Sequence, residues 1–186
     1  MPLSKIPAVG VDATGTPSSS TFFRGDNTWA APASITSGTS VTLTTKTFED
    51  FTGIPSTAKR ITVMFSNVST SGTTDWGIRL GTSSGIESTG YLGSTSNSSP
   101  SGVNETTLAR VIYSLSAATI AQGFVTIVYM GSNLWVISGS NGRSSVFYTD
   151  TCGYAKTTAS TLDRIRIVTG NGTDTFDSGT ANIMWE

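Results

Sequence analysis

The sequence predicts an all-β protein: an antiparallel, jelly-roll-like β-sandwich preceded by an extended N-terminal arm. Three observations support this fold. Charged residues make up only 12% of the 186 residues while glycines number 20 and Ser and Thr are abundant, a composition poor in helix formers. Apolar side chains alternate with polar ones over long stretches, which is the period of a strand with one buried face. Turn-forming Gly, Asn and Ser separate these stretches.

The first 33 residues lack this alternation. They hold prolines at positions 2, 7, 17 and 32, so we expect residues 1–33 to be extended and largely without a core of their own. Residues 34–186 have the length of one domain that buries about two thirds of its unfolded surface. The predicted organisation is therefore an attachment arm, residues 1–33, followed by one β-sandwich domain, residues 34–186.

The alternation defines the strands of the domain in order. It begins at Val41, is clearest at Ile61, Val63 and Phe65, and continues from Trp76. A Ser-, Asn- and Gly-rich stretch interrupts it over residues 93–102 and is the longest expected loop. Later strands are expected over residues 111–115, 124–130, 134–139, 145–154, 162–168 and 181–185. The stretch 124–130 is apolar at both odd and even positions, which indicates a strand covered on both sides, one side by a neighbouring subunit.

Turn signals separate these later strands. Gly131-Ser132-Asn133 and the segment 170–173 are expected turns, and Asn141-Gly142 favours a tight hairpin. The pattern gives eight to eleven strands, joined by long connections as well as hairpins. That mixture favours a jelly-roll-like double sheet over an up-and-down barrel.

Composition argues against several classes of function. The net charge is −1 and the basic residues are scattered, so we expect no nucleic-acid partner. No segment approaches about 18 consecutive apolar residues, so we expect no membrane insertion, and the first residues lack the pattern of an export signal. The absence of histidine excludes a Cys-His nucleophile pair and a His-ligated metal. The single cysteine, Cys152, excludes an internal disulfide, and we expect it to be a small buried hydrophobe.

The carboxylates give no catalytic or metal signature. Their spacing enforces neither the oxygen cage of a calcium ion nor the paired carboxyls of a glycosidase, and turn capping is the expected role of Asp174 and Asp177. The other carboxylates considered are Glu49, Asp50, Asp163 and Glu186. We therefore expect a protein that is not an enzyme and that uses no metal and no cofactor.

Residues 15–29, GTPSSSTFFRGDNTW, form a polar connector that ends in bulky aromatics. Such a segment cannot build its own core, so its aromatics are expected to find apolar surroundings on another chain or on the following domain. The segment resembles one that recurs in bacteriophage tail-fibre and virion-fibre proteins. The resemblance implies docking to the virion through Phe22, Phe23, Arg24 and Trp29.

The resemblance extends into the domain. The stretches FTGIPSTAKRITV (51–63), LGTSSGIESTGY (80–91), LDRIR (162–166) and TDTFDSGTANI (173–183) look like the C-terminal domain of phage tail proteins. Such domains are β-sandwiches at the tips of trimeric fibres, so the likeness implies a homotrimer with receptor-facing loops. The chain is shorter than a full tail fibre and has no shaft of heptads or β-helical repeats.

Aromatic side chains near polar loops are the candidates for receptor binding, because a sugar ring stacks on an aromatic while Asn, Ser and Thr bond its hydroxyls. The candidates are Trp76, Tyr91, Trp135, Tyr148 and Tyr154. Packing in the core or in a subunit interface is the competing interpretation for each of them.

These inferences lead to one hypothesis with two alternatives. The chain is predicted to be a non-enzymatic phage tail fibre or adhesin, assembled in the host cytoplasm and carried at the fibre tip of the virion. It would join other phage tail or virion proteins through its arm and bind a bacterial surface glycan or protein. The first alternative is a structural fibre or decoration protein of the head or baseplate. The second, a polysaccharide-degrading tailspike, needs an acidic cleft that the sequence does not reveal.

Overall fold

The chain divides into two compact units. The computed structural model describes residues 13–32, 34–97, 102–104, 106–113, 116–117, 119–144 and 149–186. We call residues 1–35 the arm unit and residues 36–186 the β unit. The described residues contain no helix, and every strand pair within the three sheets is antiparallel. The prediction of an all-β, antiparallel protein is therefore confirmed.

The arm unit contains a small hairpin. Its strands are β1 (Phe22–Phe23) and β2 (Trp29–Ala30), which pair with each other. Between them the Asn27 backbone N–H donates to the Arg24 carbonyl over 3.1 Å, and Asn27 takes a left-handed φ of 60°. The prolines predict an extended arm, but residues 13–32 are not extended throughout. Local backbone bonds close a turn that needs no core.

The larger sheet of the β unit has nine strands. Its order is β10-β9-β14-β13-β12-β6-β16-β3, and β4 also pairs with β16. The strands are β3 (Thr36–Ser37), β4 (Val41–Thr42), β6 (Arg60–Thr70), β9 (Leu92–Ser96), β10 (Gly102–Asn104), β12 (Ala121–Gly131), β13 (Leu134–Arg143), β14 (Thr149–Thr157) and β16 (Phe176–Trp185).

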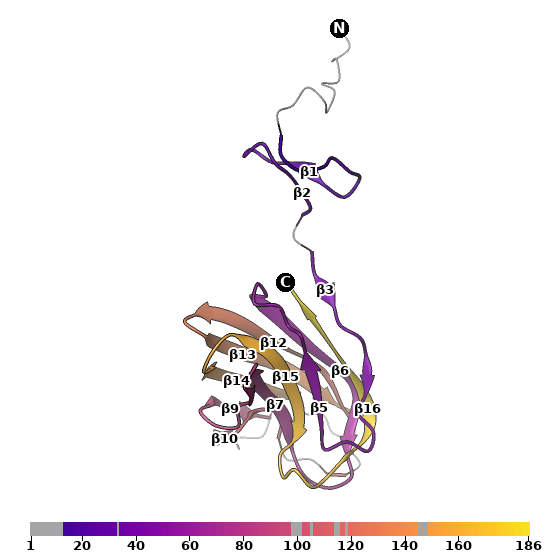
Figure 1. Ribbon diagram of the computed structural model, residues 1–186. Helices are drawn as coiled ribbons and strands as arrows, with labels where there is room; N and C mark the ends of the chain where they lie inside the picture. The colour runs from indigo at the N-terminus through magenta and orange to yellow at the C-terminus, as the bar shows by residue number, and fades with distance from the viewer. Residues whose placement is uncertain are drawn as a thin grey trace. The chain divides into compact units, whose positions relative to one another are not determined.

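The smaller sheet has five strands in the order β11-β7-β15-β5, with β8 paired to β7. They are β5 (Phe48–Thr52), β7 (Trp76–Thr82), β8 (Gly85–Ile86), β11 (Ala109–Ile112) and β15 (Leu162–Thr169). The chain passes repeatedly from one sheet to the other, as from β5 to β6 to β7, and Figure 1 shows the β unit as two layers of strands. This arrangement is consistent with a β-sandwich.

One hydrophobic core fills the space between the two sheets. Trp76 of the smaller sheet is fully buried, and its ring meets the edges of Phe65 and Phe176 of the larger sheet at centroid distances of 4.8 and 6.0 Å. The inward positions of the long strands are buried in alternation, as at Ile61 and Val63 on β6. The period-two pattern of the sequence therefore predicted the inner faces correctly.

Two local predictions were wrong and two were right. Asn141-Gly142 is not a turn, because both residues lie inside β13 and pair with Asp150 and Thr149 of β14. Part of the expected loop at 93–102 is strand, since β9 pairs with β14. The turn at residues 131–133 is confirmed by positive φ angles at Ser132 and Asn133. The turn at 170–173 is confirmed as well, where the Asn171 side chain accepts two backbone N–H groups.

The β unit has two distinguishable ends. At the entry end, the first strand β3 pairs its Ser37 with Met184, close to the C-terminus of the chain. The turn at residues 131–133 and the loops at 53–59 and 158–161 lie at this end as well. The far end carries the loops at residues 43–47, 71–75 and 170–175, which are tied together by backbone hydrogen bonds. A chain that enters at Thr36 therefore presents these loops at the opposite end of the unit.

Candidate functional site

The four predicted docking residues lie together on the hairpin of the arm unit. The rings of Phe23 and Trp29 are 5.3 Å apart, and Arg24 forms a 3.6 Å ion pair with Asp26. Phe22 is 49% exposed and Phe23 42% exposed, so both present apolar surface to water. Besides its pairing with β1, β2 bonds the preceding segment, because the Trp29 backbone N–H donates to the Thr14 carbonyl over 2.9 Å. The structure thus gathers these residues on a small, solvent-facing aromatic surface.

The predicted receptor-binding aromatics are not gathered into a site. Trp76 lies in the core, and Tyr91 and Tyr154 are buried as well. The Tyr91 hydroxyl accepts the Leu80 backbone N–H over 2.6 Å, and burial raises the pKa of this phenol. The Tyr154 hydroxyl lies 3.0 Å from that of Thr95. These contacts favour core packing for the three residues, whereas Tyr148 lies outside the described residues.

Trp135 differs from the other candidates because it lines a pocket at the entry end. The pocket has a volume of about 150 Å³ and is walled by Pro55, Ser56, Ala58, Lys59, Tyr129, Asn133, Trp135, Thr161 and Leu162. The rings of Tyr129 and Trp135 are 5.0 Å apart, and the Lys59 ammonium lies 4.4 Å from the Tyr129 ring centre. The Trp135 indole Nε1 is buried and has no hydrogen-bond partner. The pocket joins aromatic walls to amide and hydroxyl groups, although only 4% of Trp135 is exposed.

Four of the six candidate carboxylates, Glu49, Asp50, Asp163 and Glu186, are paired with cations. Asp50 bonds Arg166 through both oxygens at 2.7 Å, Asp163 bonds Arg164 at 2.7 Å, and Glu49 lies 2.5 Å from the Lys46 ammonium. The Arg164 guanidinium lowers the pKa of Asp163. Among the described residues, no cluster of three His, Cys, Asp or Glu side chains could hold a metal ion.

The two predicted capping aspartates bond groups far away in sequence. Asp174 accepts the backbone N–H of Thr74 over 3.2 Å, and Asp177 accepts the hydroxyl of Ser69. Asp174 therefore does cap a backbone group, but on the loop that precedes β7 rather than on its own turn. The first bond joins two loops at the far end of the β unit, and the second joins β6 to β16 next to them.

Sequence reasoning missed a buried ion pair. Arg143 of β13 and Asp150 of β14 form an ion pair diagonally across the two strands, because Asp150 lies directly opposite Asn141, and their side chains are only 3% and 0% exposed. The Arg143 Nε lies 2.5 Å from Asp150 Oδ2, and the backbone N–H of Tyr113 donates to Asp150 Oδ1 over 3.1 Å. Both residues occupy inward positions of their strands, and that parity is the signal that could have revealed the pair. Loss of one partner would leave a buried charge uncompensated.

Cys152 occupies another inward position of β14. It is a free, buried thiol, and burial raises its pKa to about 11. The expectation of a small buried hydrophobe is therefore met. A thiol with so little thiolate at neutral pH is poorly suited to nucleophilic chemistry.

Comparison with protein-family models, with curated proteins and with solved structures gives no match for this chain. The described part of the chain contains no helix that is long and apolar enough to cross a membrane.

Proposed function

We propose that this chain is a non-enzymatic attachment protein of a bacteriophage tail, which joins the virion through its arm unit and contacts the bacterial surface through its β unit. The observation that carries the proposal is the difference in structure between the two units. One is a small hairpin that exposes Phe22 and Phe23, and the other is an all-β body with a core of its own. The sequence resemblance to tail-fibre segments supports the same assignment.

The arm unit supplies the docking surface in this proposal. Phe22, Phe23 and Trp29 offer aromatic side chains of the kind that dominate binding energy at protein interfaces. Arg24, paired with Asp26, lies beside them on the turn and supplies a polar rim. The partner is another structural protein of the phage tail or virion, which offers an apolar pocket for these rings.

The far end of the β unit supplies the receptor contact. Its loops are rich in Ser, Thr, Asn and Asp, as at residues 71–75 and 170–175, and these groups suit the hydroxyls of a glycan or the backbone of a surface protein. Weak individual contacts add up because linked copies in a homotrimer raise the effective concentration at a repetitive surface.

The finer fold assignment belongs to the same proposal. The strand order β11-β7-β15-β5 interleaves late strands with early ones, and the larger sheet places β12 beside β6. Both features support a jelly roll in which the meander β12-β13-β14 enlarges one sheet.

Adsorption competition tests the attachment function. Purified full-length chain should bind the bacteria that its phage infects and, at saturation, should reduce phage adsorption at least about tenfold through occupied receptors. Boiled chain at the same concentration is the control. Failure to bind cells together with undiminished infection would contradict the proposal.

Docking has a separate test. Changing Phe22 and Trp29 together to Ala should abolish incorporation into particles and leave cell binding and thermal stability unchanged, because both rings lie in the arm unit. A lower melting temperature would instead show that these rings support the fold. The matched control is Phe48→Ala, which alters an exposed phenylalanine of the β unit.

The alternative function is that of a structural fibre or decoration protein of the head or baseplate. The position of the chain on the virion distinguishes it from the attachment function. Labelled-antibody electron microscopy should place the chain at the tail tip, and label on the head or baseplate would favour the alternative. Release of reducing ends from host polysaccharide by the purified chain would contradict the non-enzymatic assignment.

A further inference from the structure

The outer side of the nine-stranded sheet exposes hydrophobic side chains. We call this side the uncharged face and define it by the residues of β9, β14, β13, β12, β6 and β16 that point away from the smaller sheet. On it Leu92 is 71% exposed, Met130 65%, Phe124 55% and Val128 41%. Three of these residues alternate along β12 with the buried Val125 and Ile127. This is the strand that the sequence predicted to be apolar on both sides.

Strand register arranges these side chains in rows. Leu92 lies opposite Ala155, Ala155 opposite Val136, and Val136 opposite Val128, so one apolar row crosses four strands. A second row places Phe124 opposite Met64 and Met64 opposite Asn182. Side chains directly opposite each other on one face of a sheet are in contact range. Leu92 and Val128 therefore belong to one apolar row, and a row of uncharged Thr, Ser and Gly residues separates it from the pair Phe124 and Met64.

Charge is confined to the margins of this face. The outward positions of β12, β13 and β14 are Ser, Thr, Gly, Gln, Ala and hydrophobic residues. Of the described residues, Arg60 stands at the entry end of β6, where it pairs with Glu186, and Asp177 stands at the far end of β16. Two identical surfaces of this kind can meet without placing like charges opposite each other.

The size of the face matches a stable interface. Its five long strands have 9 to 11 residues each, so the face is about 30 Å long at ~3.4 Å per residue and about 24 Å wide at ~4.8 Å per strand. The resulting area, on the order of 800 Å², is what each partner contributes to a standard protein interface.

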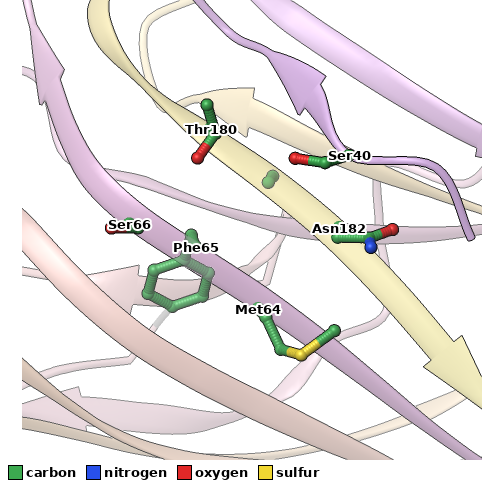
Figure 2. A pocket seen from close by; sticks show the side chains of 7 residues that line it. Ser40, Met64, Phe65, Ser66, Thr180 and Asn182 are labelled. Carbon is green, nitrogen blue, oxygen red and sulfur yellow. The ribbon is translucent and has the colours of Figure 1, made fainter. Parts of the chain in front are cut away.

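A groove continues the face at its β16 side. It has a volume of about 230 Å³ and is lined by Ser40, Met64, Phe65, Ser66, Thr180, Ala181 and Asn182. Figure 2 shows Met64 and Asn182 on neighbouring strands, with Ser40 approaching from the segment that passes β16. Because Met64 also lies opposite Phe124, the groove and the apolar rows share a wall.

We propose that a second copy of this chain covers the uncharged face. Around the threefold axis of the expected homotrimer, the same face of the two neighbouring copies supplies surface of equal extent and brings no charge that would have to be buried unpaired. This inference does not depend on the attachment function, and it assigns the contact surface of the expected homotrimer.

The test measures the mass of the full-length chain in solution by sedimentation velocity and light scattering. We expect an assembly of whole multiples of the 19.4 kDa chain, three in the case of the homotrimer. The variant with Phe124→Arg and Val128→Arg should weaken association at least about 100-fold, because arginine is tolerated on strands but would be buried unpaired between copies.

A second pair of variants keeps the inference testable even if that double variant misfolds. Phe124→Ser should weaken association about tenfold, whereas Phe48→Ser, at a similarly exposed phenylalanine on the outer side of the five-stranded sheet, should leave it unchanged. Circular dichroism and thermal melting confirm the folded state of each variant. A monomeric wild-type chain would overturn the inference, and so would an assembly that both Phe124 variants leave intact.

Discussion

The outer sides of the two sheets differ in how they meet their surroundings. The five-stranded sheet carries Arg79, Arg110, Arg164 and Arg166 on its outward positions, and the latter three pair with carboxylates. The uncharged face of the nine-stranded sheet offers Phe124, Val128 and Met130 instead. Both sides rest on the same core and follow the same alternation. The difference therefore arises only from the outward residues, and it separates a solvated surface from one that is suited to contact with protein.

Phe48 and Phe124 show this difference in a single residue type. Phe48 lies on the outer side of the five-stranded sheet, and the Arg166 guanidinium stands 3.8 Å from its ring centre. Phe124 has Met64 and Ser140 as its cross-strand neighbours. An exposed aromatic can therefore be accommodated within its own chain on one side, whereas on the other side it extends an apolar surface.

The largest effect is expected in the shared core, which sets the scale for changes on either side. Trp76→Ala should lower the free energy of unfolding by about 3–5 kcal/mol, because it removes the fully buried ring between Phe65 and Phe176. Chemical denaturation measures this change. Trp76→Phe, which also removes the unpaired indole N–H, should cost less. A loss below about 1 kcal/mol for Trp76→Ala would show that the two sheets do not share this core.

A smaller loss of stability is expected from a change on the outer side of the five-stranded sheet. Arg166→Leu removes the bidentate partner of Asp50 at a partly exposed site, so it should cost about 1 kcal/mol or less and should not change the mass of the assembly. Denaturation and sedimentation on the same sample measure both quantities. A change of assembly state with this variant would break the comparison, since it would place the five-stranded sheet in the interface.

The smallest effect is expected from pH. The pKa of Asp163 is lowered by Arg164, so this pair stabilises the folded chain above the ordinary carboxyl pKa, and its contribution is lost as the pH falls below about 4 through the folded value. The outward positions of β12, β13 and β14 hold no titratable side chain. Thermal stability should therefore fall slightly in acid while the assembly persists. Dissociation between pH 5 and pH 8 without unfolding would contradict an uncharged interface.

Alternation in the sequence predicted the inner faces of the strands because burial selects apolar residues at every second position. It also marked residues 124–130 as apolar on both sides, which is the first sign of the uncharged face. It could not locate β9, whose Ser and Thr residues are held by backbone bonds to β14 rather than by apolar burial. The turn predicted at Asn141-Gly142 was wrong. This dipeptide favours turns, but here the Asn141 side chain is buried inside a strand and donates to the carbonyl of Val111.

The candidate site was less predictable than the fold. An aromatic beside a polar loop has the same sequence signature whether it faces solvent or the core, and Trp76, Tyr91 and Tyr154 proved to be buried. The exposure of Phe22 and Phe23 was easier to predict, because the short arm around them has too little apolar surface to bury them. The pairing of Arg143 with Asp150 depends on strand register, which residue spacing alone does not give.

The methionines offer the most direct test of the claim that a second copy covers the uncharged face. Of the chain's four methionines, Met64, Met130 and Met184 lie on the strands of that face. Hydrogen peroxide oxidation of the native full-length chain, read residue by residue by mass spectrometry, reports their access to solvent. The account predicts that Met130 oxidises at least about tenfold more slowly in the wild-type assembly than in the Phe124→Arg, Val128→Arg variant. Equal rates in the two proteins would contradict it.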